Sequence, residues 1–122
     1  EPPSGKSILH PLVTEYRHWV QSADDLPDGP FDYSLVLSVL HHIPDWKSVL
    51  EGVIERTRHK VFIEVPHPKE HHSLWHGSLQ QHEFLSHQWD KQAYVIGSAR
   101  DASGRYQREM WVWDVHPNIE SF

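Results

Sequence analysis

The order of apolar and polar positions through the middle of the chain predicts a strand, a helix and a second strand. Residues 33–40, YSLVLSVL, form a nearly continuous apolar run, which is typical of a strand covered on both faces in a parallel sheet. Residues 46–58 place apolar side chains at helical spacing, and Asp45 before them predicts the N-cap. Residues 61–65 predict a second buried strand, which Pro66 ends.

The flanking parts of the chain carry different patterns. Residues 7–16 predict a helix broken by a proline, and residues 17–22 predict a short strand. Residues 70–87 predict a further helix. Residues 91–99 and 106–115 both alternate like strands, and the Ser-Gly pair between them predicts an antiparallel hairpin. Alternating strands and helices followed by a hairpin favour an α/β fold with a mostly parallel sheet and an antiparallel edge.

Composition narrows the possible partners. The chain has 122 residues, which suits one domain. Its net charge of -6 argues against a nucleic-acid partner, because anionic nucleic acids favour basic surfaces. The absence of cysteine excludes disulfides and thiolate chemistry and favours a cytoplasmic protein. No apolar run is long enough for a bilayer and no signal peptide is visible, so no membrane association is expected.

The order and spacing of these segments resemble the C-terminal part of a class I S-adenosylmethionine-dependent methyltransferase. ADDLP before FDYSLVLSVLHHI is similar to the segment that leads into the family's fourth strand. WKSVLEGVIERT and KVFIEVP are similar to the following helix and the fifth strand, and the closing strands to the hairpin of strands 6 and 7. The family's sheet order is 3-2-1-4-5-7-6, with strand 7 antiparallel.

The resemblance, which covers residues 17–115, implies a fold class. We expect a Rossmann-like methyltransferase sheet, mostly parallel with a C-terminal antiparallel hairpin. Residues 1–122 would then form a single, partial methyltransferase-like domain. The N-terminal βαβ portion is missing, and with it the glycine-rich turn that lets the backbone approach the cofactor.

The resemblance also implies S-adenosylmethionine as the cofactor. It aligns Glu1 with the acidic residue that ends strand 2 and binds the ribose hydroxyls. Ser22 stands where the family often has an aspartate that accepts a hydrogen bond from the adenine amino group. The end of the first buried strand is expected to line the donor pocket. The residues assigned to the cofactor are Glu1, Ser22, Ala23, Asp24, Ser38, Val39 and His41.

Histidines follow both buried strands of the predicted sheet. His41 and His42 come after the first strand and His67 after the second, at the strand ends where open α/β sheets bind ligands. A histidine could serve as the base for a hydroxyl or amine acceptor near neutral pH. We therefore predict His41 or His42, and then His67, as catalytic residues acting on a small-molecule acceptor. The alternative is that they are structural, because the chain has 12 histidines.

The sequence also bears on three other functions: a metal site, a hydrolase and a binding module. His72 and His76 have a spacing that can hold zinc, but Ser73 stands where the metalloprotease pattern requires glutamate, so no metal site is predicted. A hydrolase is disfavoured because the chain has no G-x-S-x-G turn. The absent glycine-rich turn favours a second hypothesis, a catalytically inactive methyltransferase-like module for binding or assembly.

The implied fold leaves the strand at residues 33–40 incomplete. In the family, strand 4 lies between strands 1 and 5, so without strand 1 this apolar strand has an unpaired edge. Such an edge is an aggregation hazard. We therefore expect a homo-oligomer or a complementing chain, a further segment of the protein, or a rearranged sheet.

Overall fold

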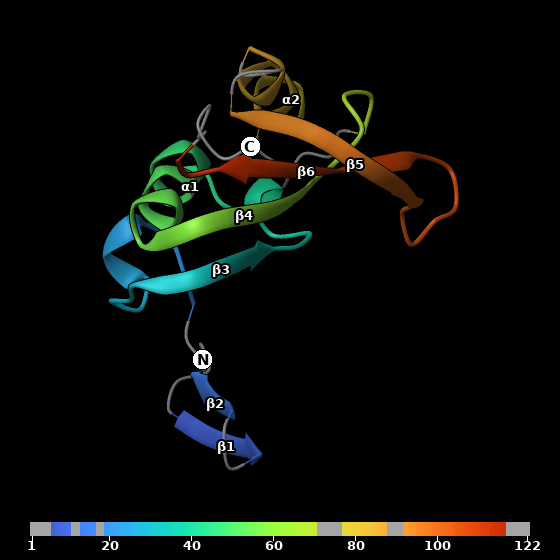
Figure 1. Cartoon of the computed structure of the whole chain (residues 1–122). Helices are drawn as coiled ribbons and strands as arrows, with labels where there is room; N and C mark the ends of the chain where they lie inside the picture. The colour runs from blue at the N-terminus through green and yellow to red at the C-terminus, as the bar shows by residue number, and fades with distance from the viewer. Residues whose placement is uncertain (1–5, 11–12, 17–18, 71–76, 88–91, 117–122) are drawn as a thin grey trace.

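The structure is a computed structural model that describes residues 6–10, 13–16, 19–70, 77–87 and 92–116. Its elements are β1 (Lys6–His10), β2 (Val13–Tyr16), the 3₁₀ turn η1 (Ala23–Asp25), β3 (Phe31–Val36), the 3₁₀ turn η2 (Leu40–His42), α1 (Trp46–Glu55), β4 (Thr57–Val65), α2 (Ser78–Ser86), β5 (Ala93–Arg100) and β6 (Gln107–Asp114). Four strands form one sheet in the order β3-β4-β6-β5. β1 and β2 form a separate two-stranded sheet, which lies apart from the larger one in Figure 1.

The predicted fold class, a mostly parallel Rossmann-like sheet, is wrong. β3 and β4 are parallel and are joined through α1, but β4 with β6 and β6 with β5 are antiparallel. The four-stranded sheet is therefore mixed and only partly parallel. The two apolar runs belong to β3 and β4, which are the parallel pair, although β3 is not covered on both faces because Phe31, Tyr33 and Leu35 are exposed. The prediction fails because β6 lies between β4 and β5 and is antiparallel to both. The hairpin predicted near the C-terminus is confirmed as β5 and β6.

The N-terminal predictions are also corrected. The helix predicted over residues 7–16 is wrong, because β1 and β2 pair there as an antiparallel ladder with Ile8 opposite Thr14. The segment carries β-branched residues on both sides of a proline, and both features favour strands over a helix. In the strand predicted over residues 17–22, residues 17–18 lie outside the described residues, and the remainder is not a strand.

Both helices cover the same face of the sheet. Val61 and Ile63 of β4 are paired with Trp113 and Trp111 of β6, and paired residues of antiparallel strands point to one face. The ring of Phe84 in α2 stacks on Trp113 with 5.7 Å between centroids. This face carries the main core: Val36, Leu40, Ile43, Val49, Leu50, Val61, Ile63, Val65, Leu85, Ala93, Trp111 and Trp113.

A glycine fixes the start of α2. The helix was predicted over residues 70–87, but it begins after Gly77, whose φ is 70°. A Cβ at this glycine would lie 2.3 Å from Nε1 of Trp46, the first residue of α1. The close approach brings the two helices together, and Trp46 meets Phe84 edge-on at 6.1 Å between ring centroids. No helix in the described part of the chain is long and apolar enough to cross a bilayer.

Candidate functional site

A pocket of about 670 Å³ opens at the end of the sheet where β3 and β4 finish and β6 begins. We call it the carboxyl-end pocket. In open α/β sheets, ligands bind outside the carboxyl ends of the parallel strands. The residues lining the pocket are Ser38, His41, His42, Lys69, Glu70, Asp101, Ala102, Ser103, Arg105, Tyr106 and Arg108.

A buried ion pair forms one wall of this pocket. Arg108 Nε lies 3.1 and 3.2 Å from the two carboxylate oxygens of Glu70, and Nη2 lies 2.9 Å from Oε1. The side chains are 10% and 1% exposed, respectively. The hydrogen bonds to Glu70 raise the pKa of Arg108, so its charge is fixed. Arg108 Nη1 also donates to Ser38 Oγ at 2.8 Å, which links the ends of β3 and β4 to the start of β6.

The turn after β4 holds the carboxylate in place. The His67 backbone N–H donates to Glu70 Oε2 at 2.7 Å, and the Glu70 N–H donates to the His67 carbonyl at 2.8 Å. The His67 ring accepts a hydrogen bond from the Lys69 N–H and stacks on Tyr106 with 5.5 Å between centroids. In these contacts His67 shapes the turn that presents Glu70.

Ser38 has an unusual backbone conformation. Its φ of 55° lies in the left-handed region, which costs a non-glycine residue about 1 kcal/mol or more. Such strain persists only where the surroundings impose it. Here the hydrogen bond from Arg108 anchors the Ser38 side chain at the mouth of the pocket.

His41 is the titratable group most affected by the site. It lies in η2, is 1% exposed, and its ring centroid is 4.0 Å from that of His42. Burial lowers its pKa from 6.5 to about 4; electrostatic interactions with His42 and Arg108 act in the same direction, and Glu70 acts against them. The imidazole is therefore neutral at physiological pH.

The β5–β6 turn forms the opposite side of the pocket. Ser103 Oγ donates to Asp101 at 2.9 Å, and the backbone N–H groups of Arg105 and Tyr106 donate to the same carboxylate. Desolvation opposes the change, but these hydrogen bonds hold the pKa of Asp101 below its usual value. The pocket thus combines three permanent cations, Lys69, Arg105 and Arg108, with two carboxylates.

The predicted catalytic residues do not all reach the pocket. His41 and His42 line it, whereas His67 is not among its lining residues and instead shapes the turn that presents Glu70. These placements leave the catalytic roles themselves as predictions.

The predicted cofactor residues are divided between two places. Ser38 and His41 line the carboxyl-end pocket, and Val39 lies between them in the chain but is 44% exposed. Ser22, Ala23 and Asp24 lie at η1, which packs against the last turn of α1, where an added Cβ on Gly52 would lie 2.9 Å from the Ala23 Cβ. They do not line the carboxyl-end pocket. Glu1 lies outside the described residues.

Sequence reasoning missed the ion pair and the β5–β6 turn. Glu70 falls in the helix predicted over residues 70–87, and Arg108 in the strand predicted over residues 106–115, so neither was singled out as a site residue. One signal was available, because a charged residue inside an apolar strand needs a buried partner.

Comparisons with known proteins do not identify the site. No family model, curated protein or solved structure matches this chain. Within the described residues, no three His, Asp or Glu side chains are placed to hold a metal ion, and the His72–His76 pair lies outside those residues.

The pocket fits a small polar ligand better than it fits all of S-adenosylmethionine. Its volume of about 670 Å³ is within the usual range for small-molecule sites. The ribose hydroxyls of the cofactor call for a carboxylate acceptor. Of the two carboxylates here, Glu70 is bound by Arg108, and Asp101 is bound within its own turn. The described residues thus suit an acceptor and do not fit the adenosine half of the donor.

Proposed function

We propose that the chain takes part in S-adenosylmethionine-dependent methyl transfer, and that the carboxyl-end pocket holds a small polar acceptor. One observation carries the proposal. A neutral, buried imidazole, a strained serine and a buried arginine–glutamate pair open onto one pocket at the carboxyl ends of a parallel strand pair. The neighbour order β3-β4-β6-β5 also agrees with strands 4-5-7-6 of the family that the sequence resembles, although the sheet is not mostly parallel.

The side chains of the pocket divide into two roles. Lys69 and Arg105 supply positive charge that orients an acceptor with anionic or strongly polar groups. His41, kept neutral by its low pKa, accepts a hydrogen bond from the acceptor's hydroxyl or amine. S-adenosylmethionine would supply the activated methyl group, with its adenosine half held outside this pocket by a further segment or a complementing chain. The lack of cysteine continues to favour a reducing compartment such as the cytoplasm for this activity.

A second candidate function is a binding module without catalysis. The division of the predicted cofactor residues between η1 and the carboxyl-end pocket favours it, because separated residues cannot form one donor site.

Calorimetric titration with S-adenosylhomocysteine distinguishes the two candidates. Methyl transfer requires saturable binding, with a dissociation constant below about 1 mM, the weak end of specific affinity. His41→Gln should then slow release of S-adenosylhomocysteine, in an assay with a panel of small polar acceptors, by about 10- to 100-fold. His87→Gln, which changes an exposed histidine outside the pocket, should leave the rate unchanged. No saturable heat at millimolar ligand would refute methyl transfer by this chain and support the binding module.

A further inference from the structure

Exposed apolar side chains concentrate on one strand of the molecule. Of the eight large apolar side chains most exposed among the described residues, five belong to β3 and the residues just after it. They are Phe31 (42% exposed), Tyr33 (59%), Leu35 (69%), Leu37 (46%) and Val39 (44%). A concentration of this kind marks an interaction surface more often than scattered exposure does.

The same strand has an open backbone edge. β3 is paired with β4 alone among the strands that the structure describes. Natural edge strands are protected against further pairing by lysines, prolines or bulges. The sole charged residue of β3 is Asp32, and Arg58 of the neighbouring strand pairs with it at 3.1 Å. The pairing of β3 with β4 is irregular between Phe31 and Tyr33, so the regular part of the outer edge, residues 33–36, is the template for another strand.

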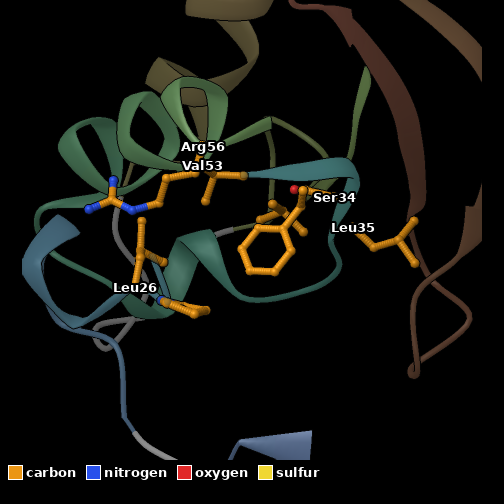
Figure 2. Close-up of a pocket in the computed structure, with 8 residues that line it drawn as sticks. Leu26, Ser34, Leu35, Val53 and Arg56 are labelled. Atoms are coloured by element: carbon orange, nitrogen blue, oxygen red, sulfur yellow. The ribbon is translucent and has the colours of Figure 1, made fainter. Parts of the chain in front are cut away.

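A second, apolar pocket lies beside this edge. It has a volume of about 250 Å³ and lies between β3, α1 and the residues after η1. Figure 2 shows Leu26 and Val53 on its two sides, with Leu35 turned away from them. Arg56 is its one charged lining residue. A strand added to β3 would cover the open side of this pocket as well as the backbone edge.

We propose that β3 pairs with β3 of a second copy of this chain, antiparallel and across a two-fold axis at Ser34. Such a contact is self-complementary, as a two-fold interface must be. It places Tyr33 opposite the partner's Leu35 and Leu35 opposite the partner's Tyr33. Aromatic–aliphatic pairs of this kind stabilise antiparallel strands.

The charges of the edge also suit a second copy. In this register Asp32 lies opposite the partner's Val36, so the two aspartates are kept apart. Within each copy the Asp32–Arg58 ion pair contributes little to stability, because its side chains are 61% and 57% exposed.

The exposed apolar side chains contribute to the contact. In this arrangement Phe31, Tyr33 and Leu35 of both copies lie side by side on one face of a continuous sheet, where each shields its neighbours from water. The dimer does not depend on the proposed methyl transfer.

Sedimentation velocity across protein concentration tests the pairing. The wild-type chain should pass from monomer to dimer, and Leu35→Lys should weaken the dimer about 100-fold, since lysine at an edge opposes pairing. The matched control is Ile96→Lys, which changes a 54% exposed residue on β5, the other edge strand, and should leave the dimer intact. A wild-type chain that stays monomeric, or a dimer equally sensitive to both substitutions, would overturn the proposal.

Disulfide trapping tests the register, because the chain has no cysteine of its own. Ser34→Cys should give a cross-linked dimer under mild oxidation, since the two copies of residue 34 lie directly opposite each other at the axis. Tyr33→Cys should not, because the two copies of residue 33 lie diagonally, about 7–8 Å apart, beyond disulfide reach. Faster cross-linking at residue 33 than at residue 34 would overturn the proposed arrangement.

Discussion

At the scale of single residues, His41 should make stability depend on pH. Its pKa is about 4 in the folded chain and near 6.5 when unfolded, so between these values the unfolded chain binds a proton that the folded chain does not. Stability should therefore fall as pH drops from 6.5 toward 4, by about 2–3 kcal/mol at 1.36 kcal/mol per pKa unit. Urea unfolding of wild type and His41→Gln at pH 7 and pH 4.5 measures this difference.

The His41→Gln substitution removes the imidazole and leaves the groups around it unchanged. His42, Arg108 and Glu70 influence its pKa, and all three stay in place in the variant. His87→Gln, an exposed change, is the control and should keep the wild-type slope. If His41→Gln loses as much stability as the wild type on acidification, burial of this imidazole is not the cause.

Residues near each other in the chain were the predictable part of the site. Ser38, His41 and His42 follow one apolar strand, and the rule that ligands lie at strand ends was enough to select them. The Glu70–Arg108 pair joins positions 38 residues apart, so its partners carry no common spacing signal. Replacing either residue of this pair should lower stability, because the other residue is then a buried charge without its counter-ion.

At the scale of elements, Gly77 should control how the two helices meet. An alanine there would take a left-handed φ of 70° and put its Cβ 2.3 Å from the Trp46 indole, so the ring or the start of α2 must move. We expect Gly77→Ala to cost about 2 kcal/mol or more in unfolding free energy. Gly97→Ala is the matched control, because its Cβ meets nothing within 4 Å, and it should change stability by less than about 1 kcal/mol. Equal effects in urea unfolding would contradict the packing argument.

The periodicity of the sequence identified most elements but not their partners. α1, β4 and the β5–β6 hairpin follow from local patterns of apolar residues and turn residues. Residues 7–16 were mistaken for a helix, because a short segment with a proline satisfies the helical spacing only by chance and becomes β1 and β2 instead. The direction of β6 next to β4 depends on contacts between distant segments, which no local pattern records.

At the scale of the whole molecule, the sheet has central strands, edge strands and a separate hairpin. β4 and β6 each have two neighbours, while β3 and β5 are at the edges (Figure 1). β1 and β2 pair only with each other in the described part of the chain. An isolated two-stranded hairpin is marginally stable in water at best. The free energy of local opening should therefore differ among these three groups.

Amide hydrogen exchange measures those differences. The amides of β4 and β6 should exchange only through global unfolding, those of β3 and β5 faster, and those of β1 and β2 fastest. Raising the protein concentration should slow exchange in β3 but not in β5, because only β3 pairs with a second copy. Leu35→Lys should remove that concentration dependence and leave β4 unchanged. Amide exchange in β1 and β2 that is as slow as in β4 would show that this hairpin is bound to the larger sheet. The open edge of β3 would then be the expected site of that contact.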